Sequence, residues 1–279
     1  MKRIMIAVSC IGLILASCGS VPITGRKQLN LVGDQEVLTL SLQEYDSFIK
    51  SAQLSTDRKN TEMVQRVGRN IANAVETWLK NNGYADEVKN YAWEFNLVKS
   101  AEVNAFCMPG GKIVVYEGIL PVVGDETSLA VVVGHEVAHA VAKHANERMS
   151  QQMIAQSGTS ILDAATKNEI VKQGAGIAIQ YGALLPYSRK HETEADELGL
   201  IFMAMAGYNP QVAPAFWDRM SQLGGSNVPE IMNTHPSSAT RTQNLQKFMP
   251  KAMEYYKGAG STTTTKSTKS TKTSTEWSF

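Results

Sequence analysis

The chain of 279 residues carries 27 basic and 26 acidic side chains, and 43% of its residues are apolar. This length allows one large domain with a sizeable core. The net charge near zero gives no electrostatic reason to expect a nucleic acid or a strongly charged substrate.

The first residues predict a secretory signal and not a part of the fold. Two basic residues precede the apolar run Ile4–Leu15, which is too short to span a bilayer. The run ends in Leu15-Ala16-Ser17-Cys18, which resembles the bacterial lipobox, where the chain is cut before a cysteine that becomes lipidated. We therefore expect a lipoprotein signal peptide over residues 1–17 and a membrane anchor through lipidated Cys18. The alternative is an ordinary signal peptide with an incidental cysteine.

The segment over residues 18–33 contains proline, glycine and a basic pair, and it predicts a tether between the anchor and the folded domain. An apolar repeat close to 3.6 residues then predicts two helices, from about Asp34 to Lys50 and from about Ser55 to Asn82. The simplest interpretation of both helices is a purely structural role.

Two β-strands are predicted next. Tyr91–Lys99 alternates apolar and polar residues, and Lys112–Tyr116 is a short apolar run. The stretch between them, which includes Asn104, Ala105 and Phe106, predicts a turn-rich loop. An exposed edge here could hold an extended peptide by main-chain hydrogen bonds, and a plain structural hairpin is the alternative.

The apolar stretch Val131–Ala142 contains the pattern His135-Glu136-x-x-His139 and predicts a buried helix. Residues i and i+4 share a helix face, so both imidazoles can bind one metal ion, for which zinc is suited. Glu136 lies roughly 100° round the helix from His135 and can reach a water on the metal. A chance pattern on a buried helix is the alternative. With the helix continuing to about residue 151, His144 points from another face, and we expect it at the surface or behind the ligands and not on the metal.

Residues 157–185 are rich in glycine, alanine and isoleucine. A helix lying on a membrane is one interpretation of this composition. The glycines and the short apolar length favour helices packed closely against the core.

A further helix beginning near residue 186 carries the acidic residues Glu192, Glu194 and Asp196. A zinc site with two histidines needs a third protein ligand, and glutamate is a known one. Glu192 and Asp196 share a face, so we expect Glu192 on the metal and Asp196 holding a ligand histidine by its other ring nitrogen. The alternative is a solvated acidic helix start.

Two residues near the C-terminus are further candidates for the active site. His235 precedes a proline in a loop, where its side chain can be aimed into a cleft, and Arg241 could face oxyanion charge from the start of the last helix. The alternative, which their spacing alone favours, is that both are ordinary surface residues. The last helix is predicted to end near Met249, and the Ser/Thr/Lys-rich residues 256–279 predict a disordered tail.

Several of these stretches together carry a resemblance to a family. The chain resembles the soluble, lipoprotein-type members of the gluzincin family that includes the CAAX prenyl proteases and the HtpX-type heat-shock proteases. The resemblance covers roughly residues 22–248 and rests on six stretches in one order: Pro22-Ile23-Thr24-Gly25-Arg26, Asn104-Ala105-Phe106, Pro109-Gly110-Gly111, the His-Glu-x-x-His helix, Glu192-x-x-Ala195-Asp196 and Thr234-His235-Pro236.

This resemblance implies an α+β, mainly helical, zincin-like metallopeptidase domain over residues 34–255, with a small sheet whose edge strand flanks the active-site helix. The substrate edge is expected at Asn104, Ala105 and Phe106. The resemblance implies one zinc ion held by His135, His139 and Glu192, with Glu136 as the catalytic base. It also implies that the tether packs on the domain, that Asp196 lies behind the ligands, that His235 lies near or on the metal, and that Arg241 belongs to the catalytic site.

We therefore expect a zinc endopeptidase that cleaves misfolded or misassembled proteins of the cell envelope. The expected location is a lipid anchor on the outer membrane of a Gram-negative bacterium, facing the periplasm. A chaperone-like or binding lipoprotein with a closed or structural zinc site is the competing function. The two differ in whether water or His235 occupies the fourth position on the metal.

Overall fold

The computed structural model of the chain describes residues 18–179, 184–223, 230–235 and 240–261. Helices make up most of it, and two small sheets complete it, so the predicted α+β, mainly helical class is confirmed. The helices are α2 (Asp34–Ser51), α3 (Arg58–Asn81), α4 (Leu120–Val123), α5 (Glu126–Val141), α6 (His144–Ala165), α7 (Glu169–Ile179), α8 (Leu185–Met205), α9 (Ala213–Gln222), α10 (Glu230–Thr234) and α11 (Arg241–Ser261). The strands are β1 (Cys18–Ser20), β2 (Lys27–Leu29), β3 (Glu94–Val98), β4 (Ala105–Met108) and β5 (Lys112–Tyr116).

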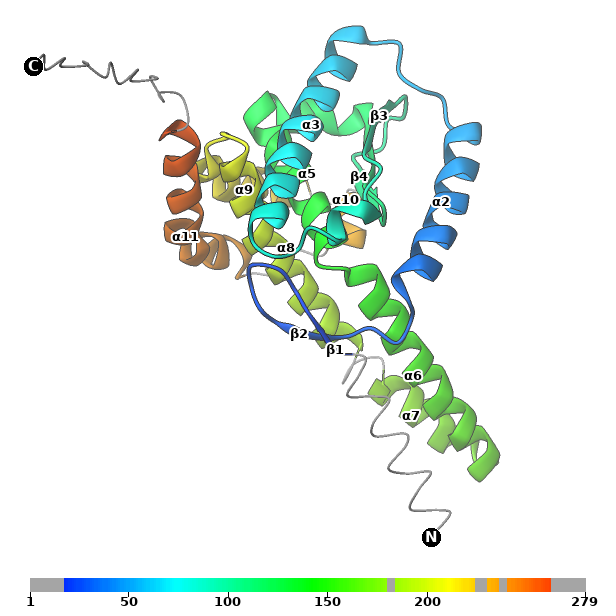
Figure 1. The fold of residues 1–279 in the computed structure, drawn as a ribbon. Coiled ribbons are helices and arrows are strands. Elements are labelled where there is room, and N and C mark those ends of the chain that lie inside the picture. Colours follow the sequence, from blue (N-terminus) through cyan, green and yellow to red (C-terminus); the bar gives the residue numbers. More distant parts are fainter. Residues whose placement is uncertain (1–17, 180–183, 224–229, 236–239, 262–279) are drawn as a thin grey trace, which may run out of the picture.

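Helix α5 lies at the centre of the fold, between α3, α8 and the three-stranded sheet (Figure 1). Nearly all of its side chains are buried, and most of them are small or apolar. The carboxylate of Asp125 caps its N-terminus by accepting a hydrogen bond from the backbone N–H of Ser128 at 2.7 Å. The helix that carries the His-Glu-x-x-His pattern is therefore fixed in place by its contacts with α3, α8 and the sheet.

The sheet beside α5 has the order β3-β5-β4. The prediction that Ala105–Met108 belongs to a loop is wrong, because these residues form β4 and pair antiparallel with β5. Gly110 and Gly111, with φ of 89° and 82°, make the tight turn between the two strands. The two strands predicted from the sequence, β3 and β5, are parallel neighbours and not a hairpin. Strand β4 is an edge of the sheet and packs against α5.

Helix α5 ends at Val141, about ten residues earlier than predicted. Lys143 adopts a left-handed conformation with φ of 52°, and a new helix begins at His144. The lysine is held there by ion pairs to Asp34 at 2.6 Å and to Glu87 at 2.8 Å. This break redirects α6, so the side-chain directions expected for one continuous helix do not apply after Val141.

Two glycines allow α5 and α8 to approach closely. A Cβ added at Gly134 would lie 2.8 Å from the carbonyl oxygen of Gly199, and one added at Gly199 would lie 2.9 Å from the backbone nitrogen of His135. Such distances are too short for any side chain, so hydrogen is required at both positions. The contact lies directly beside the His-Glu-x-x-His pattern.

The segment predicted as a tether packs on the domain. Strands β1 and β2 form an antiparallel pair. Val21, in the turn between them, is fully buried. The side-chain amide of Gln28 donates to the carbonyl oxygen of Ala142 at 2.7 Å. These contacts hold the pair, called the N-terminal hairpin below, against the end of α5.

Helices α6 and α7 project beyond the rest of the molecule (Figure 1). Side chains such as Met153 and Ile161 are exposed, and a Cβ at Gly174 or Gly176 would meet no atom within 4 Å. The prediction that these glycines mark close packing against the core is therefore wrong for the described part of residues 157–185. None of the helices in the described ranges combines the length and apolar content needed to cross a membrane.

The last helix extends to Ser261 and contains Pro250, so it is longer than the predicted end near Met249. The signal-peptide prediction for residues 1–17 and most of the predicted tail, residues 262–279, lie outside the described residues.

Candidate metal centre

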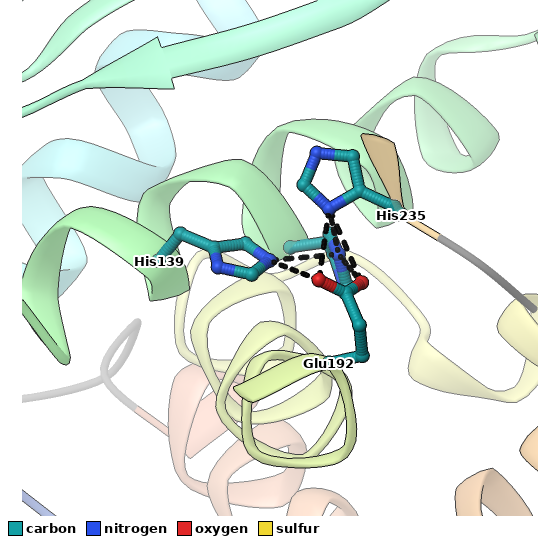
Figure 2. Close-up of side chains that lie close together, drawn as sticks. His139, Glu192 and His235 are labelled. Atoms are coloured by element: carbon teal, nitrogen blue, oxygen red, sulfur yellow. Dashed lines mark hydrogen bonds and ion pairs between the residues drawn. The ribbon is translucent and has the colours of Figure 1, made fainter. Parts of the chain in front are cut away.

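Four buried side chains from three parts of the chain converge beside α5. His135 and His139 come from α5, Glu192 comes from α8, and His235 directly follows α10. Figure 2 shows His139, Glu192 and His235 pointing toward one another. One ligand atom from each of the four residues lies within 4.8 Å of every other. The structure therefore brings together the three residues predicted as ligands and the histidine predicted near them.

The spacing of these atoms fits a tetrahedral metal ion. Ligand atoms at about 2.0–2.1 Å from zinc are separated from one another by roughly 3.3–3.4 Å. The observed separations are 3.1 Å between the Nε2 atoms of His135 and His139, 3.3 Å from His135 Nε2 to His235 Nδ1, and 3.1 Å from that Nδ1 to the Glu192 carboxylate. The carboxylate lies 3.3 Å from His135 Nε2 and 3.5 Å from His139 Nε2. Three nitrogens and one carboxylate are also a donor set that zinc accepts.

The electrostatics of the cluster favour the cation-binding charge states of Glu192 and His139, whereas His135 must give up a proton to bind a cation. Burial would raise the pKa of Glu192, but hydrogen bonds to His135 and His235 outweigh it and hold that pKa far below its usual value. Burial lowers the pKa of His139 well below its usual value, with its histidine neighbours adding to the effect. Burial also opposes protonation of His135, yet its contacts with Asp196 and Glu192 raise its pKa to about 9. A cation at the centre would take the place of that proton.

Glu136 points into the same region. Its side chain is buried, and its Oε1 atom has no hydrogen-bond partner among the described residues. That oxygen lies 3.4 Å from Nε2 of His235. An unpaired buried carboxylate oxygen is costly to maintain, which is typical of a group that has a chemical role.

Behind His135, the structure places Asp196 and Arg241. Asp196 Oδ1 lies 3.0 Å from His135 Nδ1, the position expected from the sequence. Arg241 donates to the same oxygen at 2.6 Å, and its guanidinium carbon lies 3.3 Å from the ring centroid of Trp217. The ion pair and the tryptophan hold Arg241 on the Nδ1 side of His135, and its contact with oxyanion charge stays a prediction.

Behind His139 lies a second group of contacts, and His144 takes the second of the two places expected for it, behind a ligand and not at the surface. Nδ1 of His144 is 2.9 Å from Nδ1 of His139, and Nε2 of His144 is 3.0 Å from the Glu194 carboxylate. Burial lowers the pKa of His144 to about 4 despite the nearby Glu194 carboxylate. The break at Lys143 is what turns His144 toward His139. The spacing from His139 assumed a continuous helix, so the sequence left open whether His144 lies at the surface or behind the ligands.

The predicted substrate edge corresponds to strand β4. Asn104 precedes the strand and is largely buried, and its side-chain oxygen accepts a hydrogen bond from the N–H of Ala105 at 2.9 Å. Ala105 is buried, and Phe106 packs edge-on against Phe48 with ring centroids 5.3 Å apart. These side chains therefore fix the strand, and its backbone is the part available to an extended peptide.

A buried helix with two histidines and a glutamate at this spacing, beside the edge of a small sheet, defines a zinc metallopeptidase of the zincin type. Residues 59–249 match the model of Peptidase family M48, and the chain belongs to this family. The prediction of a zinc-dependent peptidase is confirmed by this membership and by the names of the relatives described next.

The relatives include two metalloendopeptidases and a bacterial protease. The chain is 32% identical over 237 residues to "Mitochondrial metalloendopeptidase OMA1" of Schizosaccharomyces pombe, covering 83% of this chain and 66% of the relative. It is 30% identical over 247 residues to human "Metalloendopeptidase OMA1, mitochondrial", covering 84% of this chain and 46% of the relative. It is 26% identical over 207 residues to the "Beta-barrel assembly-enhancing protease" of Escherichia coli, covering 68% and 39%. The chain thus matches two thirds or less of the length of these three relatives.

These names correct the expected location. The sequence predicted an anchor on the outer membrane of a Gram-negative bacterium, but the relatives from Schizosaccharomyces pombe, Saccharomyces cerevisiae and human are named as mitochondrial enzymes. A short apolar run followed by a cysteine describes a processing signal only, and it carries too little information to identify a compartment.

Proposed function

We propose that the chain is an endopeptidase that cleaves unfolded or misassembled proteins, with His135, His139 and Glu192 as the zinc ligands. The observation that carries this proposal is the convergence of these three side chains beside the buried carboxylate of Glu136, whose Oε1 accepts no hydrogen bond among the described residues. The relatives named as metalloendopeptidases support it.

Glu136 acts as the base in this proposal. Zinc, when bound, supplies Lewis-acid polarisation of the scissile carbonyl and lowers the pKa of water toward neutrality. Glu136 accepts the proton of the attacking water at its free Oε1 and later donates it to the leaving amine. Asp196 accepts a hydrogen bond from Nδ1–H of His135, which leaves the Nε2 lone pair free for the metal.

Strand β4 is the proposed substrate-binding edge. A peptide added to this edge would be recognised mainly by main-chain hydrogen bonds, which depend little on sequence. Only a chain segment that is extended and free of its own structure can pair in this way, so unfolded proteins are the expected substrates. The name of the Escherichia coli relative refers to β-barrel assembly, and it gives the narrower expectation of cell-envelope substrates weak support.

His235 favours a resting site that is closed. Its Nδ1 lies 3.1 Å from Glu192 and 3.3 Å from His135, where the fourth ligand of a tetrahedral ion would lie. A bound His235 would exclude water from that position until the side chain moves. This is the observation that favours the second function, a binding protein whose zinc is closed off, and peptidase activity separates the two.

The test is the cleavage of unfolded casein by the zinc-loaded chain and by its Glu136→Gln variant. The variant should bind zinc as the wild type does and cleave at least about a hundredfold more slowly. Glu62→Gln, which changes an exposed carboxylate on α3, is the matched control and should cleave normally. Cleavage by Glu136→Gln at the wild-type rate would refute the mechanism. A zinc-loaded wild type that binds casein without cutting it would favour the binding function.

Lipidation of Cys18 is a separate proposal, supported by the Leu15-Ala16-Ser17-Cys18 pattern alone. Mass spectrometry of the mature N-terminus tests it. A mature chain that begins with diacylated Cys18 is expected, and an unmodified Cys18 would contradict the proposal.

A further inference from the structure

A continuous series of side-chain contacts joins the N-terminal hairpin to the metal centre. Arg26 Nε donates to Oε2 of Glu194 at 2.8 Å, and Nε2 of His144 lies 3.0 Å from the same oxygen. Nδ1 of His144 lies 2.9 Å from Nδ1 of His139. Glu194, His144 and His139 are all buried. We call these four residues the Arg26 bridge.

Only one placement of protons satisfies every contact of the bridge when His139 binds a metal. His139 offers Nε2 to the cluster, so the proton of its neutral ring is on Nδ1. His144 must then accept that hydrogen bond at Nδ1 and donate from Nε2 to Glu194. The carboxylate at the end of the series therefore determines the tautomer and the orientation of both rings.

The carboxylate of Glu194 is itself held by the N-terminal hairpin. Thr24 Oγ1 donates to its Oε1 at 2.6 Å, while Arg26 donates to its Oε2. The other end of the Arg26 guanidinium donates to both oxygens of Glu147, at 3.0 and 2.7 Å. Nε2 of His191 also lies 2.9 Å from Glu147. One guanidinium thus lies between two buried carboxylates, one from α6 and one from α8.

Removing the guanidinium would leave those two carboxylates buried without their shared cation. Such an arrangement is costly, and Glu194 and Glu147 would have to turn toward solvent. This movement weakens the acceptor that holds His144, and His144 is the group that holds His139. A residue far from the metal in sequence would then act on the geometry of a ligand.

We propose that Arg26 is a positioning residue for the metal centre, and that docking of the N-terminal hairpin through Arg26 orients the ligand ring of His139. The inference rests on the proposed function in that it takes His139 as a zinc ligand. It goes beyond that function by making the N-terminal segment part of the metal site. A chain whose hairpin is undocked binds zinc more weakly and holds it in a different geometry.

The experiment compares the full chain, its Arg26→Ala variant and its Arg66→Ala variant by zinc competition with a chromophoric chelator. Arg66→Ala is the control because it removes an arginine–glutamate pair, with Glu126, that lies outside the bridge. Arg26→Ala should raise the dissociation constant for zinc about tenfold, and Arg66→Ala should leave it unchanged. The cobalt(II)-loaded Arg26→Ala variant should show a shifted visible absorption band, because that band reports ligand geometry, and a loss of stability alone would not shift it.

Wild-type zinc affinity and a wild-type cobalt band in Arg26→Ala would overturn the proposal. If Arg26→Ala does not fold, Glu194→Gln replaces it, because the amide keeps the shape of the side chain and removes its charge. A folded Glu194→Gln variant with wild-type zinc affinity would likewise overturn it. Both readouts are independent of cleavage, so a wild type that binds zinc and fails to cut casein would refute the proposed function and leave this comparison intact.

Discussion

Replacing Gly199 by alanine should push α5 and α8 apart at the point where the two ligand-bearing helices touch. The new Cβ would lie 2.9 Å from the backbone nitrogen of His135 and 3.0 Å from its Cα. Carbon atoms in contact prefer about 3.5–4.0 Å, so the backbones must separate by roughly 0.5–1 Å. Gly199 is two helical turns from Glu192, and a shift of this size would move Glu192 relative to the two histidines of α5.

The cost follows from two opposing effects. Overpacking a tight helix contact costs about 1–3 kcal/mol, whereas alanine in place of glycine inside a helix contributes about 1 kcal/mol. Gly174→Ala on α7 is the matched control, since a Cβ there meets nothing within 4 Å and only the favourable effect remains. The Gly199→Ala variant should therefore be less stable than the Gly174→Ala variant by about 1–3 kcal/mol.

Urea unfolding of the metal-free variants, followed by circular dichroism, measures this difference. Zinc competition then reports whether Glu192 has moved, and we expect weaker binding in Gly199→Ala only. Equal unfolding free energies for the two alanine variants, together with unchanged zinc affinity, would show that the glycine contact does not hold the ligand helices together.

Three further predictions concern single side chains. Asp196→Asn should weaken zinc binding about tenfold, because a neutral amide no longer makes the His135 ring more basic; an unchanged dissociation constant in a chelator titration would contradict this. His235→Ala should raise the rate of casein cleavage if His235 closes the resting site, and a lower rate would instead give this histidine a part in the chemistry. Burial opposes ionisation of Glu147, but its hydrogen bonds to His191 and Arg26 lower its pKa to about 2. The ionised group therefore stabilises the fold fully above its unfolded pKa of about 4.5. This contribution is lost as the pH falls from 4.5 toward 2. Glu147→Gln should accordingly be about 3 kcal/mol less stable than the wild type at pH 7, with the gap closing between pH 4.5 and 2 in urea unfolding curves; a gap independent of pH would exclude this linkage.

Local patterns predicted the parts of the site that share one helix. His135 and His139 follow from the four-residue spacing on an apolar helix, and Glu192 and Asp196 follow from the same spacing on α8. Such spacings depend only on helix geometry, so no knowledge of the packing is required.

His144 shows the limit of this reasoning, which could not decide between a surface position and one behind the ligands. Its direction depends on the left-handed turn at Lys143, and that turn is held by ion pairs to two residues far away in the sequence, Asp34 and Glu87. A periodicity that continues through the break therefore predicts the wrong face. The same limit explains why β4 was taken for a loop, since its strand character depends on pairing with β5.

The sequence alone determined that this chain is mainly helical, that it carries a zinc-binding helix pattern, and which acidic residues could complete the metal site. These properties follow from periodicity along one helix at a time. Only the tertiary structure decided that α5 and α8 meet at Gly134 and Gly199 and that Arg26 connects the N-terminal hairpin to His139. Those contacts join residues far apart in the chain, and their existence depends on how whole elements pack, which no local pattern records.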